Sequence, residues 1–171
     1  MKILSGQYKG LEIKTDKNLS YRPTSSRVRK SIFDILGSLQ KLSVLDIFAG
    51  SGILGFEAAS RGATKISFVD NNRKAIQLIK SNSYLLKNEV EINLSCSKWD
   101  KFLKKKNLYD VIFADPPYGK VDIAQLTEKC LSSLLNSGRF ILESSRRDII
   151  PSGGTTRNYG DTIVTIWTKS V

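Results

Sequence analysis

Histidine is absent from the 171 residues of this chain. Its absence excludes Ser-His and Cys-His nucleophile pairs, and it removes the most common general base and metal ligand of proteins. The only two cysteines, Cys96 and Cys130, do not form a Cys-x-x-Cys pair. We therefore expect no disulfide framework and no bound metal, and we interpret the two cysteines as buried thiols in a reducing compartment.

Long apolar runs are also missing from the sequence. No segment approaches the roughly 18 apolar residues of a membrane helix, and the first ten residues lack the apolar run of a secretory signal. Hydrophobic residues make up 40% and charged residues 25% of the chain, which is ordinary for a globular protein. These features predict a cytoplasmic protein with one domain, and we expect no membrane contact and a monomer.

Basic residues exceed acidic ones, with a formal net charge of +11. Residues 1–41 contain nine basic and three acidic residues, so more than half of the excess lies in the first quarter of the chain. Basic surfaces gain affinity for nucleic acids because binding releases counterions from the phosphates. The charge indicates a polyanionic partner, although a lysine-rich solvated surface would also explain it.

The pattern of the chain changes near residue 42. Before it, residues 3–13 predict a short hairpin, and Thr24 or Ser25 is predicted to cap a helix that ends near Gly37 with basic residues on its polar side. After it, predicted strands 44–47, 65–69, 90–94, 111–114 and 140–143 alternate with predicted helices 53–61, 73–86, 99–104 and 123–135. Strands 155–159 and 162–168 would form a closing antiparallel hairpin. This order predicts an α/β fold with a mixed sheet and helices on both faces.

A glycine-rich loop follows the first strand after residue 42. The segment Asp46-Ile47-Phe48-Ala49-Gly50-Ser51-Gly52 joins a strand to a helix, where glycines allow a ligand to approach the backbone. Asp70 follows the next strand, where a carboxylate can bind ribose hydroxyls. The glycine spacing alone fits a nicotinamide dinucleotide equally well. Asp46, and Phe-Ala in place of the first tight glycine turn, argue against the dinucleotide, and the segment resembles the first motif of methyltransferases that bind S-adenosylmethionine.

A second motif, Asp115-Pro116-Pro117-Tyr118, follows the fourth strand and should lie beside the glycine loop. An exocyclic amine on a base is a poor nucleophile because its lone pair is delocalised into the ring. Asp115 and the Pro116 carbonyl could accept its two N–H groups, while the prolines stiffen the loop and Tyr118 offers a stacking face. The motif resembles that of methyltransferases that act on base amines.

The order of motifs resembles the RsmD-type family of bacterial ribosomal RNA methyltransferases, which modify a guanine N2 in small-subunit RNA. The resemblance is carried by Gly6-Gln7-Tyr8-Lys9-Gly10, Arg22-Pro23-Thr24, Arg27-Val28-Arg29, Phe48 to Gly52, Asp115 to Tyr118 and Ile141-Leu142-Glu143. It implies a seven-stranded Rossmann-like sheet, with residues 42–171 as the methyltransferase domain and residues 1–41 as an appendage of the same domain. It also implies S-adenosylmethionine as methyl donor and ribosomal RNA as partner, within a small subunit or an assembly intermediate.

The candidate site residues fall into three groups. The catalytic group is Asp115, Pro116, Pro117 and Tyr118. The cofactor-binding group is Asp46, Phe48, Ala49, Gly50, Ser51, Gly52, Asp70, Asn71, Ser97, Trp99 and Asp115. The RNA-binding group, implied by the resemblance and the basic helix, is Arg22, Thr24, Arg27, Arg29 and Lys30.

One position departs from the family pattern. Four residues before Phe102 the family usually has Asp or Asn, which binds the adenine amine, but this chain has Lys98. How the adenine is held is therefore open. Three other functions also stay open at this point, namely a DNA amino-methyltransferase, a non-catalytic RNA-binding module and a nicotinamide oxidoreductase.

Overall fold

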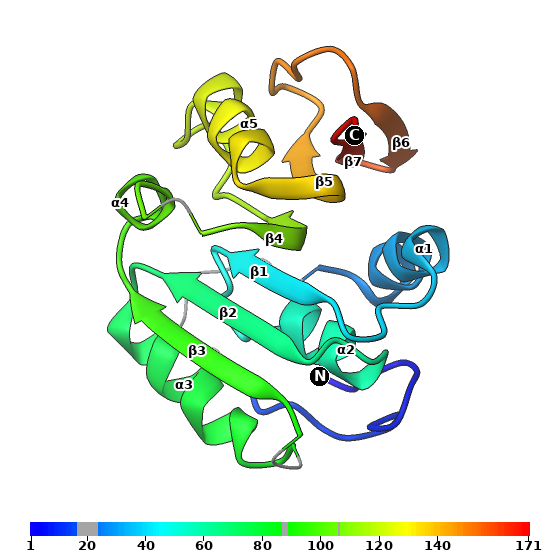
Figure 1. Cartoon of the computed structure of the whole chain (residues 1–171), viewed down its shortest axis with the longest axis vertical. Coiled ribbons are helices and arrows are strands. Elements are labelled where there is room, and N and C mark those ends of the chain that lie inside the picture. Colours follow the sequence, from blue (N-terminus) through cyan, green and yellow to red (C-terminus); the bar gives the residue numbers. More distant parts are fainter. Residues whose placement is uncertain (17–23, 87–88, 106) are drawn as a thin grey trace.

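The computed structural model describes residues 1–16, 24–86, 89–105 and 107–171. At its centre is a seven-stranded sheet with the order β3-β2-β1-β4-β5-β7-β6 (Figure 1). The strands are β1 (Ser43–Ile47), β2 (Lys65–Asp70), β3 (Glu91–Cys96), β4 (Tyr109–Ala114), β5 (Leu134–Ser145), β6 (Thr155–Tyr159) and β7 (Thr162–Thr168). The helices are α1 (Ser26–Leu36), α2 (Ile53–Ser60), α3 (Arg73–Ser83), α4 (Trp99–Leu103) and α5 (Ile123–Ser132). Strands β1 to β5 pair in parallel and β7 pairs antiparallel with β5 and β6, so the predicted mixed sheet is confirmed.

Helices cover both faces of the sheet, as the sequence predicts. Alternate strand residues point to opposite faces because the side-chain period of a strand is two. On one face Val44 and Phe113 pack in a cluster with α1, α2 and α3. On the other face Leu45 and Ile112 pack with α4 and α5. Figure 1 shows this division into two helical layers around one sheet.

The first 16 residues pack against α2 and form the expected short hairpin. The backbones of Met1 and Ile13 exchange hydrogen bonds at 2.7 and 2.6 Å, the Ile3 N–H donates to the Leu11 carbonyl at 3.0 Å, and Lys2 and Glu12 form the antiparallel bridge between these pairs. Gly6, at φ 87°, lies so close to α2 that a Cβ atom there would be 1.8 Å from the Ser60 carbonyl oxygen. The backbone N–H groups in the turn donate to Glu57 and Ser60 of α2. The predicted hairpin is thus confirmed, and its turn is attached to α2.

Helix α1 begins at the predicted cap, because the Ser25 hydroxyl accepts from the Val28 N–H at 3.2 Å, and it ends at Gly37. The prediction that Arg29 lies on its exposed polar side is wrong. Arg29 is 1% exposed, and its Nη2 donates to the Lys2 carbonyl at 2.9 Å. Burial lowers the pKa of this guanidinium, while the charge of Glu57 acts in the opposite direction. Arg29 therefore anchors the N-terminal segment and is not available to an RNA phosphate.

Further sequence predictions differ from the structure. Helix α3 ends at Ser83, before the predicted residue 86. Helix α5 ends at Ser132, short of the predicted residue 135, because the hydroxyls of Ser132 and Ser133 donate to the Lys129 carbonyl and compete with helix hydrogen bonds. The next residues then extend β5 toward its N-terminus. Cys130 is buried as expected, whereas Cys96 is exposed because it ends the edge strand β3.

No helix in the described part of the chain is both long and apolar enough to cross a membrane. Within the same residues, no three His, Cys, Asp or Glu side chains are grouped so that they could hold a metal ion.

Candidate functional site

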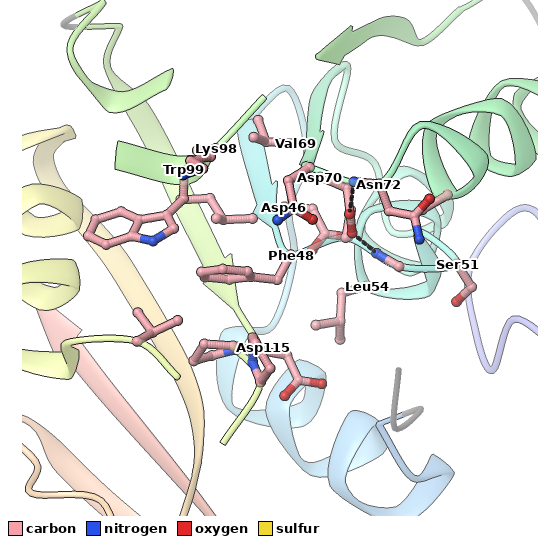
Figure 2. Close-up of a pocket in the computed structure, with 18 of the residues that line it drawn as sticks. Asp46, Phe48, Ser51, Leu54, Val69, Asp70, Asn72, Lys98, Trp99 and Asp115 are labelled. Atoms are coloured by element: carbon pink, nitrogen blue, oxygen red, sulfur yellow. Dashed lines mark hydrogen bonds between the residues drawn. The ribbon is translucent and has the colours of Figure 1, made fainter. Parts of the chain in front are cut away.

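A cavity of about 560 Å³ opens where β1, β2 and β4 end at the same edge of the sheet (Figure 2). Small-molecule sites have volumes of about 300 to 1,000 Å³, so this cavity can hold a nucleoside-sized ligand. Parallel strands end at one edge, and the loops that follow them therefore converge. The cavity brings together these candidate residues: Thr24, Asp46, Phe48, Ala49, Gly50, Ser51, Asp70, Asn71, Ser97, Trp99, Asp115, Pro116, Pro117 and Tyr118.

The glycine loop turns sharply between β1 and α2. Phe48 has φ 61° and Gly50 has φ 53°, and the Gly52 N–H donates to the Ala49 carbonyl at 2.7 Å. Gly52, at φ 77°, is the one cofactor candidate that does not line the cavity. A Cβ atom there would lie 2.9 Å from the Phe56 ring, so Gly52 faces the core, on the side of the loop away from the cavity.

Asp46 lies at the base of the cavity, where β1 ends. It is 2% exposed, and its Oδ2 accepts from the Gly55 N–H of α2 at 3.0 Å. The pKa of this carboxyl is raised to about 8, chiefly by burial and also by the nearby charge of Asp70, while the Gly55 hydrogen bond acts in the opposite direction. Asp46 is therefore largely protonated near pH 7, and a cationic ligand in the cavity would favour its ionised form.

Asp70 organises the loops around the cavity. Its Oδ2 accepts from the Gly50 N–H at 2.9 Å, and its Oδ1 accepts from the Asn72 N–H at 2.8 Å (Figure 2). Its backbone carbonyl accepts from the Ser97 N–H at 3.0 Å. One residue thus connects the loops after β1, β2 and β3, and its carboxylate retains lone pairs that can accept hydroxyl groups.

The loop after β3 forms another wall. Figure 2 shows Lys98 and Trp99 on the side of the cavity toward which the Phe48 ring points. The Lys129 ammonium lies 5.3 Å from the centroid of the Trp99 ring. Lys98 occupies the position where the family usually has an acid or amide, so the amine-binding acceptor of that pattern is replaced by a donor.

Asp115 lies on the side of the cavity where α1 begins (Figure 2). The Thr24 hydroxyl donates to Asp115 Oδ2 at 3.3 Å. Pro116, Pro117 and Tyr118 line the same cavity immediately after Asp115. The structure thus brings the motif that follows β4 beside the glycine loop, as the order of strands predicts.

The candidate RNA-binding residues are separated in space. Thr24 lines the cavity, whereas Arg27 and Lys30 are exposed and line a second cleft beside α1. Arg29 is buried, and Arg22 lies outside the described residues.

Sequence reasoning missed part of the cavity wall. Asn72 lines the cavity and caps α3, where its side chain accepts from the Lys74 N–H at 2.9 Å. The sequence signal that could have identified Asn72 as a cavity residue was its position two residues after Asp70. The other lining residues were not predicted because they lie in loops or look like core residues in the sequence. They are Ile47, Ile53, Leu54, Val69, Ala75, Lys98, Lys120 and Val121.

Comparison with known proteins gives consistent matches. The family model described as "Conserved hypothetical protein 95" matches residues 1–167. "Putative rRNA methyltransferase YlbH" of Bacillus subtilis (strain 168) is 35% identical over 160 residues, covering 87% of this chain and 84% of the relative. "Ribosomal RNA small subunit methyltransferase D" of Haemophilus influenzae is 33% identical over 123 residues, covering 69% of this chain and 64% of the relative.

Among solved structures, "Putative methyltransferase yhhF from Escherichia coli" superposes with a TM-score of 0.87 at 25% sequence identity, covering 100% of this chain and 98% of that one. The family match and the structural match both extend over almost the whole chain, including the N-terminal segment, and they confirm the resemblance found in the sequence. The chain therefore belongs to the family described as Conserved hypothetical protein 95, the RsmD family of methyltransferases.

Proposed function

We propose that the protein transfers a methyl group from S-adenosylmethionine to the exocyclic N2 amine of a guanine in small-subunit (16S) ribosomal RNA. The proposal rests on one observation: a single cavity contains both a donor half and an acceptor half. The glycine loop with Asp70 forms one half, and Asp115 with the residues that follow it forms the other. The names of the relatives support ribosomal RNA as the substrate.

The residues of the first half fit the donor. Asp70 would accept ribose hydroxyls, and Gly50 and Ser51 would allow the ligand to approach the loop backbone. Asp46, at the base of the cavity, would stabilise a positively charged group once it is ionised. Phe48 and Trp99 offer apolar surface for the adenine. S-adenosylmethionine supplies an electrophilic methyl group on its sulfonium when it is bound.

The second half would hold the acceptor. The Asp115 carboxylate and the Pro116 carbonyl would accept the two N–H groups of the amine and direct its nitrogen toward the donor half. As the methyl–sulfur bond breaks to leave a neutral thioether and the carbon–nitrogen bond forms, the nitrogen would lose one proton, and an acceptor on that N–H would assist the loss. Tyr118 would stack on a base that has left its helix. Orientation then supplies much of the rate enhancement.

The charge of the molecule supports an RNA partner. The net charge of +11 favours binding to phosphates, and the exposed Arg27 and Lys30 lie on the helix that begins beside Asp115. Thr24, Arg27 and Lys30 are proposed to contact the RNA near the target base. We propose a small ribosomal subunit or an assembly intermediate as the form in which the RNA is bound.

The variant Asp115→Ala tests the assignment of the acceptor half. It removes an acceptor for the amine while leaving the Asp70 loops intact, so methyl transfer should fall by about 100-fold or more. Donor affinity, measured by calorimetry, should change little. Asp161→Ala, which removes an exposed carboxylate in the turn between β6 and β7, is the matched control and should behave as wild type. Full activity in Asp115→Ala would contradict the assignment.

A further inference from the structure

A second cleft of about 560 Å³ lies between α1 and the edge strand β6. The residues that line it from α1 are Arg27, Lys30, Ser31, Asp34 and Ile35, and those from β6 are Arg157 and Tyr159. Arg157 and Tyr159 are two residues apart on one strand, so they share the face of the sheet that α1 covers. The cleft therefore joins segments from the two ends of the chain.

The walls of this cleft are held in place by hydrogen bonds. The hydroxyls of Ser31 and Tyr159 are hydrogen-bonded and connect α1 directly to β6. Arg139 of β5 donates through Nη2 to the carbonyl of Leu36 at 3.0 Å and attaches the other end of α1 to the sheet. Arg29 attaches the middle of α1 to the N-terminal segment. Binding in the cleft would thus require little reorganisation of the backbone.

The cleft carries an uncompensated positive charge. Lys30 forms an exposed ion pair with Asp34 at 2.8 Å, which offsets its charge. No carboxylate in the described part of the chain forms an ion pair with Arg27 or Arg157. Two exposed guanidinium groups that form no ion pair with a described residue, in one cleft, fit a phosphate diester because each can donate two parallel hydrogen bonds to its oxygens.

The cleft also lies close to the acceptor half of the main cavity. Thr24, whose hydroxyl contacts Asp115, is three residues before Arg27. Thr24 precedes the N-cap Ser25 and Arg27 lies in the first turn of α1, so their Cα atoms are at most about 11 Å apart. Successive nucleotides of a stacked strand are about 3.4 Å apart along its axis. A strand that places one base beside Asp115 would therefore reach the cleft within about three nucleotides.

We infer that the cleft between α1 and β6 binds the RNA backbone within about three nucleotides of the target base, with Arg27 and Arg157 holding one phosphate. This inference rests on the proposed function, because the RNA enters the cleft as the substrate of the main cavity. Arg157 is the new element, since it contributes from β6, the strand of the sheet farthest from the glycine loop.

The test compares a double variant, Arg27→Ala with Arg157→Ala, with wild type. Its measurement is kcat/KM for methylation of small ribosomal subunits from cells that lack this protein, at several KCl concentrations. Each phosphate contact contributes roughly 0.7 to 0.9 to the slope of log affinity against log salt. Because the two arginines hold one phosphate, the slope should fall by about 0.7 to 0.9, and kcat/KM at low salt should fall by about tenfold or more. Donor affinity should not change.

Two further variants make the result specific. Lys65→Ala with Lys80→Ala removes two exposed charges on the β2 and α3 side, away from the cleft, and should retain the slope of wild type. Arg27→Lys with Arg157→Lys keeps both charges and should retain most of the slope. If the alanine double variant matches the Lys65 and Lys80 control while wild type is active, the cleft inference is wrong and the proposed function stands. If wild type does not methylate the subunits, both fail.

Discussion

Asp46 and Asp70 are neighbouring carboxyls at one sheet edge, but their surroundings differ. Asp70 accepts two backbone N–H groups from the loops that it connects. Asp46 is almost fully buried, and its carboxyl accepts from the N–H of Gly55. This difference raises the pKa of Asp46 and makes it a pH-dependent group at the base of the cavity.

Asp46 should therefore make the stability of the ligand-free protein depend on pH. Burial raises its pKa in the folded protein to about 8, whereas an exposed Asp has a pKa of about 3.9. The folded state then binds more protons between these values, so the free energy of unfolding should fall as pH rises from about 4 to about 8. Asp46→Asn lacks this dependence.

The measurement is urea unfolding of wild type and Asp46→Asn at pH 5, 6, 7 and 8. Other titrating groups contribute to both proteins, so the difference between their free energies of unfolding isolates Asp46. As pH rises, the free energy of unfolding of wild type should fall relative to that of Asp46→Asn by up to about 1.4 kcal/mol per pH unit. A difference that is constant over this range would show that the raised pKa is wrong.

At the scale of elements, the N-terminal segment is held to α2 by a buried carboxylate. Glu57 is 0% exposed and accepts from the N–H groups of Leu4 at 2.8 Å and Ser5 at 3.1 Å. It also accepts from Arg61 Nε at 3.0 Å. Ser60 of the same helix accepts from the Tyr8 N–H at 2.9 Å. The segment is thus part of the folded core, and its Ile3 and Ile13 are buried.

The variant Glu57→Ala should destabilise the protein by about 3 to 5 kcal/mol, because it leaves two amide donors and a mostly buried guanidinium without their acceptor. Urea unfolding measures this loss. Glu128→Ala, at an exposed position of α5, should change stability by less than about 0.5 kcal/mol. A loss below about 1 kcal/mol in Glu57→Ala would contradict the role assigned to this carboxylate.

Elements whose pattern depends on burial were predictable from the sequence, and elements that depend on individual hydrogen bonds were not. The closing strands Thr155–Tyr159 and Thr162–Thr168 have the predicted bounds. The end of α5 was misplaced because apolar residues continue past Ser132 into β5. Arg29 was misplaced because its position in the helix does not reveal its acceptor, the carbonyl of Lys2.

At the scale of the whole molecule, the cavity follows from the order of the strands. Asp46, Asp70 and Asp115 end or follow parallel strands, so the sequence was sufficient to predict that they meet at one edge. The contact between Thr24 and Asp115 and the cleft with Arg157 join residues far apart in the chain. Such contacts depend on how α1 packs across the sheet, which local patterns do not determine.

The most direct test of the central claim is the transfer of labelled methyl groups from S-adenosylmethionine to small ribosomal subunits, and to their naked RNA, from cells that lack this protein. Nucleoside analysis then identifies the product. The expected result is N2-methylguanosine at one site with wild type and none with Asp115→Ala. A different methylated base would contradict guanine N2 as the target, and no incorporation into either substrate would contradict the proposed activity itself.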